Sequence, residues 1–183
     1  MNNALLLIDI QKEYTTPGRD FYLQGIDESL AHCRQLLAHA RLNAWDIIHI
    51  QHSNAGKEGV TRFMPDTEYF DFANGFEPLL GELHFVKTDF SCYSSPEFEQ
   101  FMNTDGQAQR IHMIGYNSVM CCLSTLEVAR DRKHKMFFIA DASLAKSMPG
   151  NDEASTHEFM VNVYKAKKLA EIIYTKDVLA PAT

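Results

Sequence analysis

The chain has 183 residues, of which 45% are hydrophobic and 22% are charged, the composition of an ordinary globular protein. At roughly 150 residues per domain, this length predicts one domain over residues 1–183. The 17 basic and 24 acidic residues give a net charge of −7, which argues against general binding to nucleic acid or to anionic membranes. No apolar run approaches the ~20 residues of a membrane span. The N-terminus has no basic segment before its first apolar run, so we expect no signal peptide.

The cysteines show no disulfide framework and no CxxC pair: they are Cys33, Cys92, Cys121 and Cys122. A disulfide scaffold or a zinc knuckle is therefore not expected. The adjacent Cys121 and Cys122 would form only a strained disulfide. This usage predicts free thiols in a reducing, cytoplasmic location.

Six short apolar segments predict strands, at 5–10, 47–51, 84–87, 111–115, 136–140 and 171–174. Most are nearly continuous in apolar residues, which is typical of parallel strands covered on both faces. Helical patterns lie between them. The first begins at Asp27 or Ser29, and its apolar residues share one face: Leu30, Cys33, Leu37 and Ala40.

A second helix begins at Pro96 and ends before Gly106. A third covers about 120–130, after Ser118. A fourth begins at Asn151 or Asp152, with an apolar stripe predicted to face the core: Phe159, Val163 and Ala166. This alternation predicts an α/β fold with three layers, a mainly parallel six-stranded, Rossmann-like sheet with helices on both faces.

The stretch 54–82 interrupts this alternation. A connection of this length in a compact domain is usually functional. We expect a lid or a pocket wall, and the alternatives are an oligomer contact or a plain loop.

Three reactive side chains follow predicted strands, where ligands bind in open α/β sheets. Asp9 follows the first strand, Lys87 ends the third, and Cys121 begins the helix after the fourth. Taken singly, the Asp is a turn cap, the Lys an exposed cation and the Cys a small core residue. Together they are a base, a cation and a nucleophile at one sheet edge, where the helix N-terminus and the lysine favour the thiolate.

Several motifs run in order along nearly the whole chain: Ala4–Gln11 with its Asp-x-Gln, Val86–Lys87 with Phe90–Tyr93, Gly115–Cys121 with Thr125 and Ala129, Asp141–Ala142 and His157. In these motifs the sequence resembles the isochorismatase-like cysteine hydrolases, a superfamily that includes nicotinamidases, N-carbamoylsarcosine amidase and ureidoacrylate amidohydrolase. The spacing from Gly115 and Thr125 favours Cys121 over Cys122 as the nucleophile.

The resemblance implies a mechanism. Asp9 takes the thiol proton, Cys121 attacks a carbonyl carbon, and Lys87 orients both groups and offsets their charge. The backbone N–H groups of Asn117 and Cys121 hold the oxyanion, after a cis peptide bond between Tyr116 and Asn117. Asp9 then protonates the leaving amine and activates water against the acyl-enzyme.

Two segments depart from the family pattern. Ser118-Val119 replaces Thr-Asp or Thr-Glu, and 64–67 is a degraded Pro-Gly-Thr turn. The nicotinamidase branch holds a metal through an Asp-x-His motif, at whose positions this chain has His52 and Asn54. These are poor transition-metal ligands, so we expect no metal and no cofactor.

Several side chains near the proposed chemistry are candidates for substrate binding: Gln11, His52, Phe63, Tyr93, Tyr116 and Met120. Aromatic and methionine side chains suit a small planar or apolar group. The leading hypothesis is a metal-independent hydrolase of a small amide, carbamoyl or ureido compound. The alternatives are a vinyl ether hydrolase that uses Asp9 without the thiol, and a non-catalytic thiol-redox protein. The family also implies a homo-oligomer, a dimer or tetramer.

Overall fold

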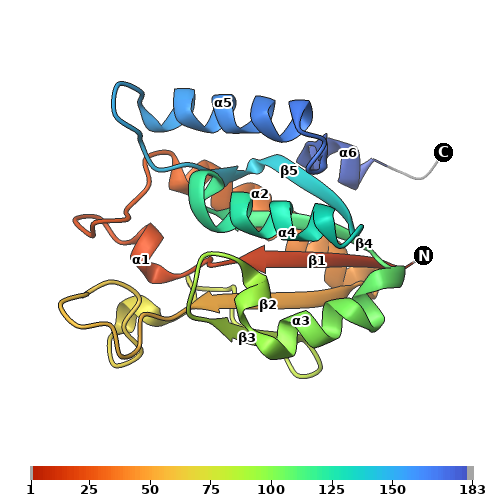
Figure 1. The fold of residues 1–183 in the computed structure, drawn as a ribbon, viewed down its shortest axis with the longest axis horizontal. Coiled ribbons are helices and arrows are strands. Elements are labelled where there is room, and N and C mark those ends of the chain that lie inside the picture. Colours follow the sequence, from red (N-terminus) through yellow and green to blue (C-terminus); the bar gives the residue numbers. More distant parts are fainter. Residues whose placement is uncertain (1, 181–183) are drawn as a thin grey trace.

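The computed structural model describes residues 2–180, apart from the side chains of 107 and 108. Six parallel strands form one sheet in the order β3-β2-β1-β4-β5-β6. The strands are β1 (Asn3–Ile8), β2 (Asp46–His52), β3 (Leu83–Lys87), β4 (Arg110–Tyr116), β5 (Lys135–Leu144) and β6 (Glu171–Ile173). All six predicted strands are confirmed, and so is the three-layer fold class (Figure 1).

The helices cover both faces of this sheet. They are α1 (Lys12–Thr15), α2 (Ile26–Leu42), α3 (Pro96–Asn103), α4 (Leu123–Asp131), α5 (Glu153–Ala166) and α6 (Thr175–Leu179). Short 3-10 turns are η1 (Glu68–Phe70), η2 (Cys92–Ser94) and η3 (Asp105–Ala108), and η4 (Ser118–Cys122) is a π-helical turn.

Alternate residues of the central strand β1 serve two apolar cores. Leu6 and Ile8 pack with the buried faces of α3, α4 and α5. Leu5 and Leu7 pack with α2 on the other face. The strand is buried on both sides, which explains its continuous run of apolar residues.

The expected helix starts and faces need three corrections. Helix α2 begins at Ile26, before Asp27 and Ser29, because Gly25 adopts the left-handed conformation that ends the preceding turn. The third helix begins as the π-helical turn η4 and continues as α4. Asp152 caps α5 as predicted, but Phe159 is 66% exposed, and the core face is instead Thr156, Met160 and Tyr164. The larger Tyr164 ring fills the space against Phe138.

The segment between β2 and β3, yellow in Figure 1, lies beyond the carboxyl ends of β1 and β2. Its end is held by Glu82, which accepts from Arg41 Nε at 2.7 Å, His49 Nε2 at 2.8 Å and the Leu79 N–H at 2.9 Å. Burial by itself would raise the pKa of Glu82, but these partners lower it to about 2. The carboxylate is therefore a charged anchor for this connection.

Because the Glu82 carboxylate is charged in the folded protein, we expect the protein to lose stability in acid. Because folding lowers the pKa of Glu82, its stabilisation is present above the unfolded-state pKa, about 4.3, and is lost as the pH falls towards 2. Urea unfolding between pH 5.5 and 2.5 is expected to show a smaller acid loss in Glu82→Gln than in the native chain. The exposed Glu58→Gln is the control. Parallel curves for the native chain and Glu82→Gln would contradict the assignment.

Gly115 marks a close approach of β4 to β1. Its φ is +116°, and a Cβ there would overlap the carbonyl oxygen of Ile8, one residue before Asp9. We expect Gly115→Ala to lower the free energy of unfolding by more than about 3 kcal/mol, since steric overlap adds to backbone strain. Gly150, at φ +84° with open space around it, is the control, and its Ala variant should cost about 1–2 kcal/mol. Equal losses in chemical denaturation would contradict the close-contact argument.

Candidate active site

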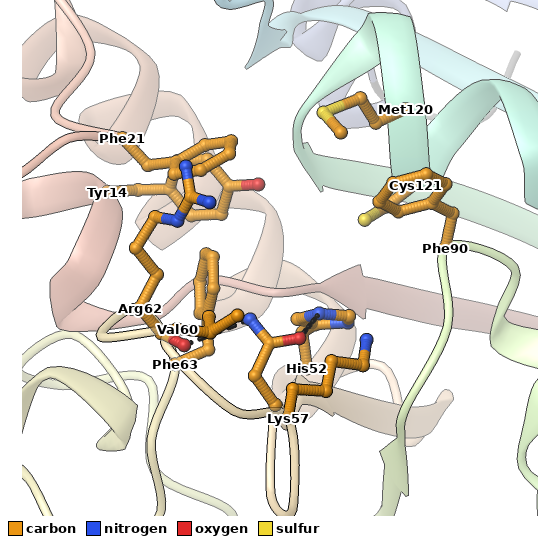
Figure 2. A pocket seen from close by; sticks show the side chains of 11 residues that line it. Tyr14, Phe21, His52, Lys57, Val60, Arg62, Phe63, Phe90, Met120 and Cys121 are labelled. Carbon is orange, nitrogen blue, oxygen red and sulfur yellow. Dashed lines mark hydrogen bonds between the residues drawn. The ribbon is translucent and has the colours of Figure 1, made fainter.

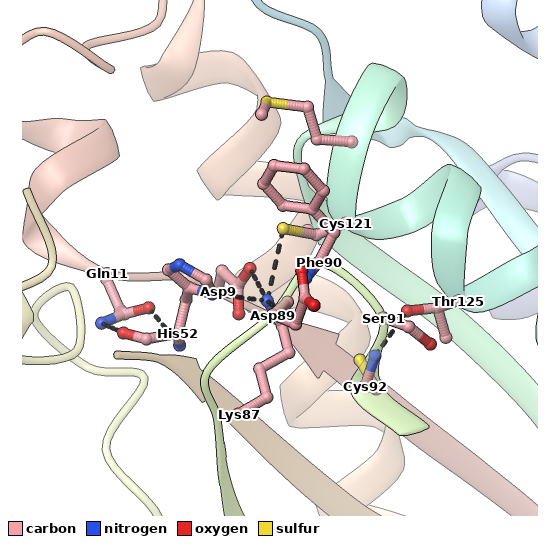
Figure 3. A network of polar contacts seen from close by, with 12 residues as sticks. Asp9, Gln11, His52, Lys87, Asp89, Phe90, Ser91, Cys92, Cys121 and Thr125 are labelled. Carbon is pink, nitrogen blue, oxygen red and sulfur yellow. Dashed lines mark hydrogen bonds and ion pairs between the residues drawn. The ribbon is translucent and has the colours of Figure 1, made fainter. Parts of the chain in front are cut away.

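Asp9, Lys87 and Cys121 meet at the carboxyl edge of the sheet (Figure 3). Lys87 Nζ lies 2.9 Å from Asp9 Oδ2 and 3.3 Å from Cys121 Sγ. Asp9 and Lys87 are fully buried, and Cys121 is 4% exposed. The three predicted side chains, which are separated by up to 112 positions in the chain, therefore form one cluster.

Asp9 leaves β1 at a sharp turn. Its φ is +52°, a left-handed conformation that Asp tolerates better than most residues, and its N–H donates to the Ile50 carbonyl at 3.1 Å. Within the described part of the chain, its Oδ1 has no hydrogen-bond donor. A buried, unpaired carboxylate oxygen beside a thiol is a ready proton acceptor.

Lys87 is the centre of the cluster. Besides Asp9 and Cys121, its ammonium lies 3.1 Å from His52 Nδ1 and donates to the Asp89 carbonyl at 3.2 Å. Burial by itself would lower the pKa of Lys87, but its ion pair with the Asp9 carboxylate, and the nearby Cys121 sulfur, hold that pKa above the ordinary value. Lys87 therefore stays protonated.

Cys121 lies in the first turn of η4, where backbone N–H groups lack helical acceptors. Burial raises the pKa of its thiol well above the ordinary value, Lys87 opposes that rise, and Asp9 adds to it. Lys87 favours the thiolate, as expected from the sequence, but burial and Asp9 outweigh it, so the thiol stays protonated. Its proton must then be taken as the sulfur attacks.

The neighbouring Cys122 turns away from the cluster. It belongs to the core, with its thiol 3.7 Å from the Gly115 carbonyl. Behind the nucleophile, Thr125 Oγ1 accepts from the Cys92 N–H at 3.0 Å, which ties α4 to the segment after Lys87 (Figure 3). Of the two adjacent thiols, Cys121 is the one that contacts Asp9 and Lys87.

The segment before Cys121 contains the predicted oxyanion donors. The peptide bond between Tyr116 and Asn117 is cis. Asn117 is fully buried, and its carbonyl accepts from the Cys122 N–H at 3.2 Å. Ser118 does not cap the helix; its hydroxyl contacts the Leu144 carbonyl and His157.

The residues at the family's metal position bond to each other. His52 Nε2 lies 3.0 Å from Asn54 Oδ1, while Nδ1 faces the Lys87 ammonium. Burial lowers the pKa of His52, and Lys87 lowers it further, so the ring is neutral.

Asp9, His52 and Cys121 do offer donor atoms within 4.8 Å of one another. The ammonium of Lys87 already lies within 3.3 Å of all three residues. A divalent cation would have to displace a buried positive charge, so these side chains do not fit a metal.

A cavity of about 290 Å³ opens above Cys121 (Figure 2). Its lining is mainly aromatic and apolar, with two cations: Tyr14, Phe21, His52, Asn54, Lys57, Val60, Arg62, Phe63, Phe90, Met120 and Cys121. Three of the substrate-binding candidates, His52, Phe63 and Met120, lie in this wall. The expectation that part of 54–82 lines a pocket also agrees with this geometry.

The other three candidates do not line this cavity. Gln11 bridges the sheet and the long connection, donating to the carbonyls of His52 at 3.1 Å and Phe70 at 2.7 Å. Tyr93 packs against His134 and Phe98. The Tyr116 side chain lies in the apolar core on the α2 side of the sheet, where its hydroxyl donates to Ser29 at 3.1 Å. Nearness in sequence to the reactive residues did not predict which face these side chains take.

Sequence reasoning missed Tyr14 and Phe21 on one wall, Phe90 on another, and Lys57 and Arg62 at the long connection (Figure 2). Tyr14 follows Gln11 by three residues on α1, but Gln11 itself does not line the cavity, so this spacing did not indicate the wall. The other missed residues lie in turns, where no repeating pattern in the sequence indicates which way a side chain points.

Comparison with known proteins identifies the family to which the chain belongs. The model of the Isochorismatase domain matches residues 3–177. The chain belongs to the isochorismatase family. It is accordingly a hydrolase of that family, and its resemblance to the isochorismatase-like cysteine hydrolases is confirmed.

Individual relatives of this isochorismatase-family hydrolase are distant. The uncharacterized isochorismatase family protein YddQ of Bacillus subtilis is 25% identical over 154 residues, covering 84% of this chain and 83% of YddQ. The crystal structure of an isochorismatase from Pseudomonas putida KT2440 superposes with a TM-score of 0.83 at 26% identity, covering 96% and 89% of the two chains. N-carbamoylsarcosine amidase from Thermoplasma acidophilum has the same fold, with a TM-score of 0.79 at 15% identity over 98% and 100%.

Among the described residues, no helix of this hydrolase combines the length and the apolar character that a bilayer crossing requires.

Proposed function

We propose that this protein is a metal-independent cysteine hydrolase that cleaves a C–N bond of a small amide, carbamoyl or ureido compound. The observation that carries the proposal is the buried contact of one ammonium, Lys87, with both Asp9 and Cys121 at the floor of a cavity. Nucleophile, base and cation are the parts that acyl transfer through a thioester requires. The N-carbamoylsarcosine amidase with this fold indicates that the fold accommodates such chemistry.

In the proposed reaction, Asp9 removes the thiol proton as Cys121 attacks the carbonyl carbon. The backbone N–H groups of Asn117 and Cys121 stabilise the oxyanion, an interaction that typically contributes roughly 100- to 1000-fold in rate. Asp9 returns the proton to the leaving nitrogen, and the C–N bond breaks to leave a thioester on Cys121. Water, deprotonated by Asp9, then releases the acid and the thiol.

Lys87 keeps its proton throughout these steps. Its charge compensates whichever partner is negative, first the Asp9 carboxylate and then the developing thiolate. The neutral His52 ring accepts a hydrogen bond from the Lys87 ammonium and so helps to hold it in position.

A second candidate is vinyl ether cleavage, because the Pseudomonas putida protein of 26% identity is described as an isochorismatase. In that chemistry Asp9 acts as an acid and the thiol is not needed. The two candidates therefore differ in their dependence on Cys121.

The test is a panel of small primary amides, N-carbamoyl compounds and ureido acids assayed for ammonia release, with isochorismate as the vinyl ether. Cys121→Ala is expected to lower amide hydrolysis by about 1000-fold or more, since the nucleophile is lost. Cys122→Ala, which removes a thiol that does not reach the cavity, is the matched control and should retain activity. Cleavage of isochorismate that survives Cys121→Ala, without amide hydrolysis by the native protein, would favour the second candidate.

A further inference from the structure

Three aromatic rings of the cavity wall contact one another. Tyr14 comes from α1, Phe21 from the turn that follows it, and Phe63 from the long connection between β2 and β3. The ring centroids lie 5.7 Å apart for Tyr14 and Phe21, 5.3 Å for Tyr14 and Phe63, and 5.6 Å for Phe21 and Phe63. Figure 2 shows the three rings on one side of the cavity, across from Cys121. This part of the wall therefore depends on how three separate segments are held together.

The Arg19 guanidinium joins these three segments. Its Nε and Nη2 donate to Glu13 Oε2 on α1, at 3.2 and 2.9 Å. Its Nη2 also donates to the carbonyl of Thr61 on the long connection, at 3.1 Å. Arg19 itself belongs to the turn after α1. Each of the three joined residues comes one or two positions before a ring of the wall, so one side chain connects the backbones that carry all three rings.

The surroundings of Arg19 hold its guanidinium in one orientation. Glu13 is fully buried, and a buried carboxylate requires a paired cation. The guanidinium carbon also lies 3.9 Å from the centroid of the Tyr69 ring, so the plane is stacked while its edge donates hydrogen bonds. Phe63 has a φ of +54°, a left-handed conformation that a bulky residue adopts only where its surroundings impose it. The bond from Arg19 to Thr61, two residues earlier, is one of these constraints.

We propose that Arg19 is a positioning residue for substrate binding, which fixes the three rings relative to one another and so sets the shape of the cavity above Cys121. Arg19 does not line the cavity, so it acts through the rings and not by contact with the substrate. Its partner Glu13 is separate from the cluster of Asp9, Lys87 and Cys121, so the reactivity of the thiol does not depend on it. The inference rests on the proposed function, because it concerns the same cavity and nucleophile.

Alkylation of Cys121 by iodoacetamide and by its N-phenyl derivative, iodoacetanilide, tests this role without a known substrate. Both reagents form a thioether at the sulfur with loss of iodide, but iodoacetanilide must also place a phenyl ring in the cavity. The ratio of their rates at Cys121, read by mass spectrometry and divided by the ratio for glutathione, cancels the thiolate fraction. We expect this normalised ratio to favour iodoacetanilide about tenfold in the native protein, since a phenyl ring is buried against fixed aromatic side chains.

Arg19→Met should lower the normalised ratio about fivefold or more and leave the iodoacetamide rate within about twofold, because the wall loosens while the reactive cluster is unchanged. Arg19→Lys should restore only part of the preference, since an ammonium keeps the charge beside Glu13 but lacks the planar fork. Arg130→Met is the matched control. It breaks an exposed ion pair with Asp131, at 2.8 Å, and should change neither rate.

A preference for iodoacetanilide that survives Arg19→Met, or that is absent from the native protein, would overturn the positioning role and leave the cysteine hydrolase standing. Equal losses of both rates in Arg19→Met would also overturn it, because Arg19 would then only maintain the fold. If neither reagent labels Cys121 in preference to Cys33 and Cys92, the proposed nucleophile fails as well. With a substrate from the amide panel, Arg19→Met should raise KM about tenfold and leave kcat within about twofold.

Discussion

Asp9→Asn is expected to lower the hydrolytic kcat/KM by about 100- to 10,000-fold, the typical contribution of a general base, while Cys121 reacts faster with iodoacetamide. The first effect follows because the amide cannot accept the thiol proton. The second follows because the Asp9 carboxylate raises the pKa of Cys121 whereas Lys87 lowers it. Without the carboxylate the thiol pKa falls, so more thiolate is present at pH 7.

If Asp9 is the proton acceptor, Asp9→Asn lowers hydrolysis but speeds the alkylation of Cys121. The loss of a purely structural residue would not speed alkylation. Labelling of Cys121 should begin at a lower pH in Asp9→Asn than in the native protein, measured per cysteine by mass spectrometry. Asp71→Asn, which alters an exposed ion pair with Lys12, is the control and should change neither readout. Slower alkylation in Asp9→Asn, together with lost hydrolysis, would mean that Asp9 only maintains the site's structure.

Lys87→Met is expected to lower the free energy of unfolding by about 3–5 kcal/mol, because it leaves the buried carboxylate of Asp9 without its partner. Both side chains of this pair are fully buried at 2.9 Å. The exposed pair of Lys12 and Asp71, at 3.1 Å, provides the comparison: Lys12→Met should cost no more than about 1 kcal/mol. Urea denaturation at pH 7 measures both.

The double variant Asp9→Asn with Lys87→Met decides whether the cost arises from an unpaired charge. Since it removes both charges, it should be more stable than Lys87→Met alone, although it is inactive. If the double variant is no more stable than Lys87→Met, the loss comes from packing of the lysine chain and not from the unpaired Asp9.

The fold was predictable because its signals are local. Continuous apolar runs such as Leu5–Ile8 predict doubly covered strands wherever they occur, and the alternation with helices predicts a parallel sheet. Helix faces were less certain: in α5 both the Phe159 stripe and the adjacent Met160 stripe are apolar. In the folded protein, Tyr164 is buried edge-on against Phe138, whereas Phe159 is 66% exposed.

The reactive cluster was predictable for a topological reason. Asp9, Lys87 and Cys121 each follow a strand, and parallel strands bring their carboxyl ends to one edge. The protonation of the cluster was not predictable, because it depends on burial. The sequence shows a thiol at a helix start, whereas the structure shows that burial and Asp9 oppose the thiolate.

The sequence by itself determined the α/β architecture, the family and the three residues that meet at the sheet edge, since these depend on periodicity and strand order. The tertiary structure decided which neighbours face the substrate. Gln11 and Tyr116 turn to structural bonds, while Tyr14 and Arg62 enter the cavity. Side-chain direction in turns is set by contacts with distant segments, so the lining of the pocket is decided only in the folded chain.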